Sequence, residues 1–316
     1  MTSTNLALSH HPDTYPVVPA DPLEEVTQLL LEPSTTAIAV QKLVQDLDAI
    51  RASRSAEEWR EYTRAFQQHP LLKPLHQDAF TYRGFRKPRG YAGDAVLMDM
   101  VYGTGDGELV AKSSDLGKRI YAVAETTGIF TSTRDRVARL ATGIDDVCSQ
   151  NPNAHIMSVA CGHLREAATS EAIKANRFGR FVGHDQDKRS LRVIQKNHPK
   201  VECVAASIGE LMDGSVNPGS FDYIYSAGLY DYLDDEIGRR LLQTLVGMIR
   251  PGGRIMIVNF LPNLPTLGYM EAAMDWWMVY RPVEQLHALA DNLPGAKSSR
   301  VTTDPLKHLN YLEVNF

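Results

Sequence analysis

One segment in the middle of the chain, residues 156–166, constrains the fold more than any other part of the sequence. Residues 156–160 can form a buried strand, a small-residue turn around Gly162 follows, and the turn opens a helix. A second apolar run, residues 180–184, ends in Asp185. A strand, a glycine turn, a helix and an acid at the tip of the next strand are the parts with which an α/β sheet holds an adenosine-type ligand.

The same alternation continues to the end of the chain and predicts the fold class. Short apolar runs alternate with amphipathic helices, which predicts an α/β, Rossmann-like, mainly parallel sheet covered on both faces. The last two runs lack an intervening helix and predict an antiparallel hairpin at one edge. The strands are expected near residues 155–160, 180–184, 201–204, 221–226, 254–259, 297–303 and 309–315, and the helices near 163–175, 187–196, 234–249 and 268–279.

The chain before residue 150 has a different character. Residues 1–20 are proline-rich without periodicity and are expected to form a disordered arm. Residues 21–150 show helical spacing and predict a helical N-terminal or lid domain, ahead of a Rossmann-like domain in residues 151–316. Ser55, three residues before Glu58, predicts a capping box, and Ser132 is expected to start another helix.

A basic segment rich in glycine and aromatic residues, residues 82–94, precedes a short apolar helix. It is either a surface loop that ends with Asp94 as a helix cap, or a rim that closes over a ligand. We favour the rim, because two tyrosines and a phenylalanine are costly in a loop that contacts nothing. Tyr91 is its candidate binding residue.

Composition excludes several classes of partner. The net charge of −5 provides no field for nucleic acid. No apolar run reaches the roughly 20 residues that span a bilayer, and the N-terminus lacks the pattern of a secretory signal. Three scattered cysteines give neither metal-ligand spacing nor a disulfide framework, so we expect no metal and a cytoplasmic location.

Ligands of parallel α/β sheets bind beyond the carboxyl ends of the strands, so four predicted strand tips supply candidate residues. Gly162 permits a close backbone approach, and Asp185 can accept hydrogen bonds from ribose hydroxyls. The candidates from the four tips are Ala160, Cys161, Gly162, Asp185, Gln186, Ser207, Ile208, Ser226, Ala227 and Gly228.

On these motifs the C-terminal half resembles the class I S-adenosylmethionine-dependent methyltransferases. Residues 160–164 resemble their glycine motif in a shortened form, and residues 221–226 and 249–253 resemble the fourth strand and the turn before the fifth. The resemblance implies S-adenosylmethionine as the cofactor, Asp185 on the ribose, and Ser207 and Ile208 beside adenine. A narrower likeness, in residues 90–94, 225–233, 258–260 and 276–281, is to bacterial enzymes that make 3-hydroxy fatty acid methyl esters as signals and to cyclases that form azetidine-2-carboxylate.

Four further residues are candidates for catalysis or cofactor binding. Tyr230 follows the fourth strand, where its ring could stabilise a sulfonium, and Tyr91 could serve the same cation. Asn259 is either a turn former or a hydrogen-bonding group of the pocket. Arg134 could pair with the cofactor carboxylate, although a solvated helix position is the plainer interpretation. His163 and His184 are expected to be structural.

Three functions remain open at this point. The first is methyl transfer to a carboxylate or similar acceptor on a small molecule, since a carboxylate needs no base. The second is cyclisation of S-adenosylmethionine, with release of methylthioadenosine. The third is S-adenosylmethionine binding without catalysis.

Overall fold

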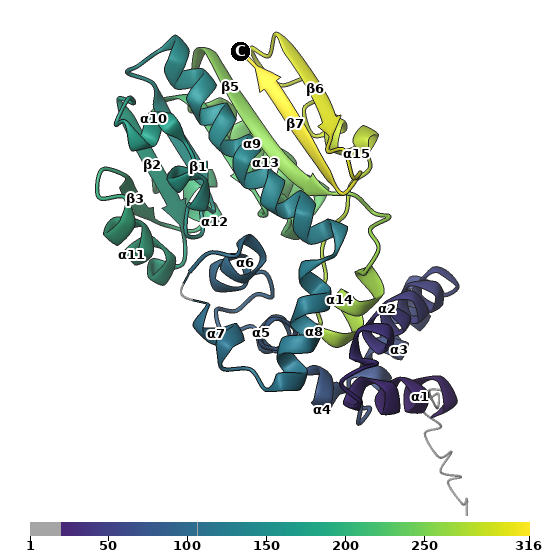
Figure 1. The fold of residues 1–316 in the computed structure, drawn as a ribbon. Helices are drawn as coiled ribbons and strands as arrows, with labels where there is room; N and C mark the ends of the chain where they lie inside the picture. The colour runs from purple at the N-terminus through teal and green to yellow at the C-terminus, as the bar shows by residue number, and fades with distance from the viewer. Residues whose placement is uncertain (1–19, 106) are drawn as a thin grey trace, which may run out of the picture.

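The computed structural model describes residues 20–105 and 107–316 (Figure 1). This part of the chain contains a seven-stranded sheet with the order β3-β2-β1-β4-β5-β7-β6. Strands β1 to β5 are parallel, and β7 pairs antiparallel with both β5 and β6. The predicted mainly parallel sheet with an antiparallel edge is therefore confirmed. The strands are β1 (His155–Val159), β2 (Arg180–Asp185), β3 (Glu202–Ala205), β4 (Phe221–Ala227), β5 (Ile249–Phe260), β6 (Ser298–Thr303) and β7 (Leu309–Asn315).

The strand order reverses next to β1, and this fixes where a ligand can bind. The chain runs outward from β1 through β2 to β3 and then returns to place β4 on the other side of β1. The connections that leave β1 and β4 therefore diverge, and they open a crevice at the carboxyl ends of the strands.

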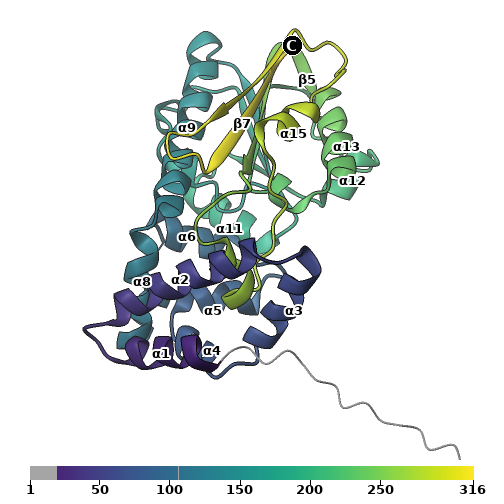
Figure 2. The ribbon, with the colours of Figure 1, turned by 90° about the vertical axis from the view of Figure 1, so that its right-hand side faces the viewer.

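Side chains on successive strand residues point to opposite faces of the sheet. On β4, Tyr223 and Tyr225 join the core on one face, and Ile224 joins the core on the other. Three helices pack on the tyrosine face and three on the opposite face, as Figure 2 shows for α9 and α13. They are α9 (Gly128–Gln150), α10 (Glu171–Lys174) and α11 (Lys188–Asn197), and α12 (Ile208–Met212), α13 (Asp235–Val246) and α15 (Val283–Ala288).

The N-terminal helices form a layer beyond the carboxyl edge of the sheet, and α9 runs from that layer along the sheet (Figures 1 and 2). The predicted capping box is present, because Ser55 and Glu58 exchange both hydrogen bonds. Asp94 caps its helix through the backbone N–H groups of Val96 and Leu97. The helices are α1 (Ala20–Leu31), α2 (Thr36–Ala52), α3 (Ala56–Phe66), α4 (Leu72–Leu75), α5 (Ala79–Arg86), α6 (Ala95–Tyr102), α7 (Glu108–Ala111) and α8 (Asp115–Glu125).

Three predicted helices differ from the observed ones. Ser132 does not start a helix, because α9 begins at Gly128, and the Ser132 hydroxyl donates to Asp304. The helix expected over 163–175 is split into a 3₁₀ turn, η1 (Arg165–Ala168), and α10. The helix expected over 268–279 is α14 (Leu267–Ala273), which ends before Asp275, a residue with a left-handed backbone (φ 47°).

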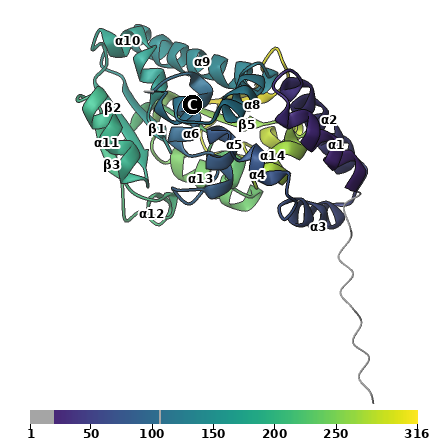
Figure 3. The ribbon, with the colours of Figure 1, turned by 60° about the horizontal axis from the view of Figure 1, so that its bottom comes forward.

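The two halves of the chain interlock through α14. This helix leaves the sheet and packs against α2 and α3 in the N-terminal layer, as the view in Figure 3 shows. Glu271 of α14 accepts hydrogen bonds from Arg51 (2.7 Å) and from the Trp59 indole (2.6 Å). The expected division at residue 150 stays a proposal, and the expected arm falls mostly on residues 1–19, outside the described residues. Over residues 20–105 and 107–316, no helix has the length and apolar character to cross a membrane.

Candidate active site

A cavity of about 540 Å³ lies at the carboxyl ends of the parallel strands. The loops that follow β1, β2, β3 and β4 all contribute to its wall, which brings together residues far apart in the sequence. From these loops the cavity is lined by Ala160, Cys161, Gly162, Asp185, Gln186, Ala206, Ile208, Ala227 and Gly228.

Asp185 is tied directly to the glycine turn. Its Oδ2 accepts the Gly162 N–H (2.8 Å), and its Oδ1 accepts the Asp187 N–H (2.7 Å). Ala160 and Gly162 both have φ of 54°, so the chain turns sharply beside the carboxylate. Burial raises the pKa of Asp185, and its two backbone hydrogen bonds oppose that rise. Because each carboxylate oxygen has a second lone pair, Asp185 can still accept from a ligand hydroxyl.

Two of the expected residues at the fourth strand tip point away from the cavity. Ser226 is fully buried, and its hydroxyl donates to Val159 O (3.0 Å). Tyr230 is also fully buried, in the core on the α13 face, and its hydroxyl has no hydrogen-bond partner. Strand alternation and the 3₁₀ turn η2 (Tyr230–Tyr232) are the cause, since they turn Ala227 and Asp231 toward the cavity instead.

Three more expected residues do not line the cavity. Ser207 caps α12, and its hydroxyl accepts the Glu210 N–H. Asn259 donates to Asp231 Oδ1 (2.6 Å) and Val279 O (2.9 Å), and thus supports the site from behind. Arg134 is partly exposed, donates from Nε to Val101 O (2.6 Å) and pairs with Glu125. These contacts hold the Arg134 side chain outside the cavity, and its expected role on the cofactor carboxylate stays a prediction.

Arg136, one of the residues that sequence reasoning missed, provides the most informative group in the cavity wall. It is 3% exposed and lines the cavity, yet its Nη2 donates only to the Tyr102 hydroxyl (2.6 Å) and its Nε has no partner. No carboxylate among the described residues lies within salt-bridge distance of it. A buried guanidinium in this state is stabilised by an anionic ligand. The sequence signal for its burial is that Arg136, Leu140 and Ile144 are spaced four residues apart and therefore lie on the same face of α9.

Asp231 supplies a carboxylate to the same cavity. Its Oδ1 accepts from Asn259 and from the Phe260 N–H (2.9 Å), and Asn259 is held in turn by the fully buried Arg281 (2.6 Å). Burial raises the pKa of Asp231 to about 6. Asp231 is therefore a fixed carboxyl that titrates close to neutral pH.

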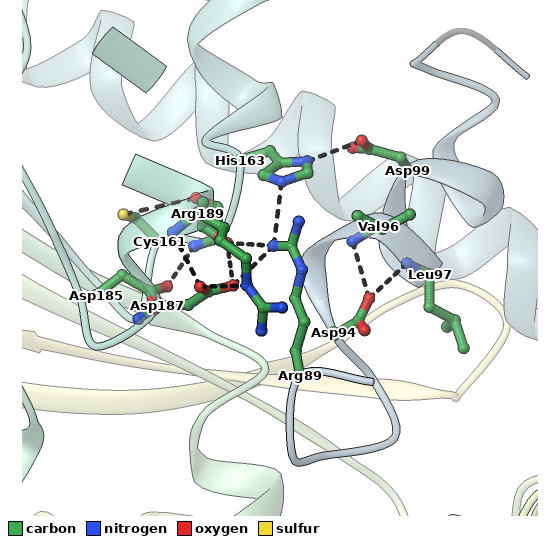
Figure 4. A network of polar contacts seen from close by, with 12 residues as sticks. Arg89, Asp94, Val96, Leu97, Asp99, Cys161, His163, Asp185, Asp187 and Arg189 are labelled. Carbon is green, nitrogen blue, oxygen red and sulfur yellow. Dashed lines mark hydrogen bonds and ion pairs between the residues drawn. The ribbon is translucent and has the colours of Figure 1, made fainter. Parts of the chain in front are cut away.

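Residues 82–86 of the segment expected as a rim belong to α5, and residues 87–94, which we call the rim, contribute Arg89, Gly90, Tyr91 and Gly93 to the cavity wall. Tyr91 lines the cavity, and burial raises the pKa of its hydroxyl. Arg89 pairs with Asp187 beside the β2 tip (2.7 Å), and both side chains are nearly buried. Figure 4 shows His163 between Arg89 and Asp99, with its Nδ1 2.8 Å from the Asp99 carboxylate. The Arg89–Asp187 ion pair joins the rim to the loop after β2.

Beyond the strand tips the cavity continues between the N-terminal helices and α14. We call this part the helical chamber. Its walls are mainly apolar and come from α2, α5, α8, α9 and α14. They include Val40, Val44, Phe80, Ile120, Val123, Phe130 and Met270.

Comparisons with known proteins agree with this architecture. Residues 157–257 match the family model of a methyltransferase domain. No curated protein sequence matches the chain. Among solved structures, a protein described as a possible exported protein from Bordetella parapertussis has a TM-score of 0.59 and 16% identity, over 94% of each chain. Magnesium protoporphyrin IX methyltransferase from Synechocystis PCC 6803 has a TM-score of 0.49 and 12% identity, over 75% of this chain and 99% of that chain.

The family match covers the chain from β1 into β5, which is the part that builds the cofactor edge of the sheet. The sheet topology and the match over residues 157–257 indicate the same fold. The chain is an enzyme with the class I S-adenosylmethionine-dependent methyltransferase fold, and S-adenosylmethionine is the cofactor expected for it.

Proposed function

We propose that this enzyme transfers a methyl group from S-adenosylmethionine to a carboxylate on a largely apolar small molecule. The observation that carries the proposal is the continuity of the cavity. The loops at the strand tips form a cofactor seat, and the same cavity extends into the helical chamber. The chamber offers a second, apolar molecule a place beside the cofactor seat.

The residues of the seat suit S-adenosylmethionine. Asp185 can accept from the ribose hydroxyls, and Gly162 allows the backbone to approach the ligand. Arg136 would hold the carboxylate of the methionine part. When bound, the cofactor supplies an electrophilic methyl carbon on a cationic sulfur.

The contribution of the protein to such a displacement is alignment and exclusion of water. The rim, fixed by Arg89 and Asp187, would keep water from the reacting atoms. The Tyr91 ring offers an aromatic face to the cationic sulfur. A carboxylate acceptor is ionised at neutral pH and needs no base.

A hydroxyl acceptor is the second candidate, and Asp231 is the observation that favours it. This carboxyl lines the cavity, is held in one orientation by Asn259, and has a pKa of about 6. A group of this kind can remove a proton from an alcohol during transfer.

The decisive experiment is identification of the sulfur product. The protein is incubated with S-adenosylmethionine alone, and then with a panel of apolar carboxylic acids or the corresponding alcohols. S-Adenosylhomocysteine that appears only with an added acid, together with the methyl ester, supports the proposal. Methylthioadenosine without an acceptor would indicate the cyclase alternative, and binding without any product would indicate a non-catalytic protein. Asp185→Ala serves as the control with an impaired cofactor seat.

We also propose that the enzyme acts in secondary or signal metabolism, that it is related to the signal synthases and cyclases named above, and that it is located in the cytoplasm.

A further inference from the structure

Three polar side chains form a hydrogen-bonded cluster in the mainly apolar wall of the helical chamber. They are Asp78, Thr81 and Tyr269, from the start of α5 and from α14, and all three line the cavity. Asp78 and Thr81 are each 1% exposed, and Tyr269 is 8% exposed. Figure 3 shows α5 and α14 near one another in the layer beyond the strand tips.

The hydrogen bonds within this cluster leave acceptors and no donors. Thr81 donates its hydroxyl proton to Asp78 Oδ2 (2.6 Å), and the Phe80 and Thr81 N–H groups also donate to Asp78. The Tyr269 hydroxyl lies 3.0 Å from Thr81 Oγ1 and must therefore donate to it. The unused capacity includes the Tyr269 oxygen and the second lone pair of Asp78 Oδ1, and both can only accept.

The capping role of Asp78 does not account for the whole cluster. Asp94 is a buried capping aspartate as well, and Arg83 pairs with both of its carboxylate oxygens at 2.8 Å. No Lys, Arg or His among the described residues forms a salt bridge with Asp78. A buried carboxylate that faces a cavity without a cation is stabilised by a ligand that donates hydrogen bonds.

We propose that the acceptor molecule carries a hydrogen-bond donor, a hydroxyl or an ammonium group, at the end remote from its methyl-accepting group, and that Asp78 and Tyr269 bind this donor. The inference rests on the proposed function, because it places the acceptor in the helical chamber. It narrows the substrate class from apolar acids to apolar acids with a polar far end.

The test uses saturated straight-chain carboxylic acids of increasing length as probes, together with their ω-hydroxy and ω-amino counterparts. Binding to the full-length protein saturated with S-adenosylhomocysteine is measured by calorimetry, and methyl ester formation with S-adenosylmethionine is measured separately. At one chain length we expect the ω-hydroxy acid to bind about tenfold more tightly than the unsubstituted acid, from one added hydrogen bond. The ω-amino acid gains more if Asp78 is the main acceptor, because the bond is then charge-assisted.

Variants test whether Asp78 and Tyr269 cause the preference for ω-hydroxy acids. Tyr269→Phe and Asp78→Asn should reduce the ω-hydroxy preference, and Asp78→Asn retains a residue that can cap α5. Tyr121→Phe is the matched control, because its buried hydroxyl donates to Met100 O and does not line this cavity. Asp234→Asn is the second control, because it caps α13 far from the chamber.

The outcomes separate this inference from the proposed function. Methyl ester formation with equal affinity for substituted and unsubstituted acids would overturn the distal donor site and leave the proposed function intact. A preference that survives both variants would also overturn the role of Asp78 and Tyr269. Binding of S-adenosylhomocysteine without binding of any acid would overturn both proposals.

Discussion

Replacement of Arg136 by methionine should have opposite effects on cofactor affinity and on the stability of the free protein. The Arg136 guanidinium is buried in the cavity wall with one hydrogen bond and no carboxylate partner. In the complex it would face the cofactor carboxylate, and loss of one partner of such a buried charge pair costs about 2–5 kcal/mol. We therefore expect affinity for S-adenosylhomocysteine to fall roughly 30- to 5,000-fold.

The free protein should respond in the other direction. Without ligand, the Arg136 charge is desolvated and forms no salt bridge, although the attraction of Asp231 opposes the cost of its burial. An apolar side chain of similar length removes that desolvation cost. We expect Arg136→Met to raise the free energy of unfolding by about 1 kcal/mol or more, which corresponds to about 2 °C or more in Tm for a chain of this size. Thermal unfolding of the protein without added ligand measures this change.

Two controls make the assignment specific. Methylthioadenosine lacks the amino acid part of the cofactor, so its affinity should be nearly the same in wild type and Arg136→Met. Arg134→Met, two residues earlier on the same helix, removes a partly exposed arginine outside the cavity and should leave all affinities unchanged. Calorimetric titration that finds equal losses for methylthioadenosine and S-adenosylhomocysteine would refute a carboxylate contact at Arg136.

Three further variants test the rest of the site. Tyr230→Phe should leave kcat unchanged and stability equal or slightly higher, because it removes a buried hydroxyl without a partner; a large fall in kcat would restore Tyr230 as a catalytic residue. With an alcohol acceptor, kcat/KM should rise with pH up to about 6 and then level off, because Asp231 loses its proton over this range. Asp231→Asn should abolish that rise, and an unchanged pH profile in the variant would exclude Asp231 as the base. Arg89→Ala frees the rim from Asp187 and should speed S-adenosylhomocysteine dissociation severalfold, measured by stopped-flow; an unchanged rate would exclude a role of the rim in retention.

The sheet could be predicted from the sequence because its signals are local. Each buried strand is a short apolar run, and the acid at the end of the second run stands at the tip of β2, as expected. The helix errors have local causes that outweigh periodicity. Ser170 caps the N-terminus of α10, and its hydroxyl donates to Asp145 (2.5 Å). The one expected helix is therefore divided into η1 and α10. α14 stops where Asp275 adopts a left-handed backbone, a local conformation that apolar periodicity does not report.

The orientation of individual side chains was harder to predict than the position of the loops. Tyr230 and Asp231 are adjacent in the same turn, yet the first enters the core beside α13 and the second faces the cavity. A shift of one residue in the alternation of side chains after the end of β4 would exchange their positions. From the sequence, Tyr230 is the more attractive candidate for the cavity wall because an aromatic ring stabilises a sulfonium. Arg136 was missed for a related reason, since a charged residue on a buried helical stripe is normally assigned to the surface.

The distribution of charge along the cavity suggests an order of binding. The sheet end holds the Arg136 guanidinium, which forms no salt bridge, and the chamber end holds the Asp78 carboxylate, which has no cation partner among the described residues. A carboxylate acceptor that entered first would be drawn to Arg136, at the position proposed for the cofactor carboxylate. With the cofactor already bound, Arg136 would be neutralised, and the sulfonium would become the nearest cation for the acceptor. We therefore expect an unsubstituted carboxylic acid to compete with the cofactor in the absence of S-adenosylhomocysteine. Once the seat is filled, the same acid should bind in the chamber without competition.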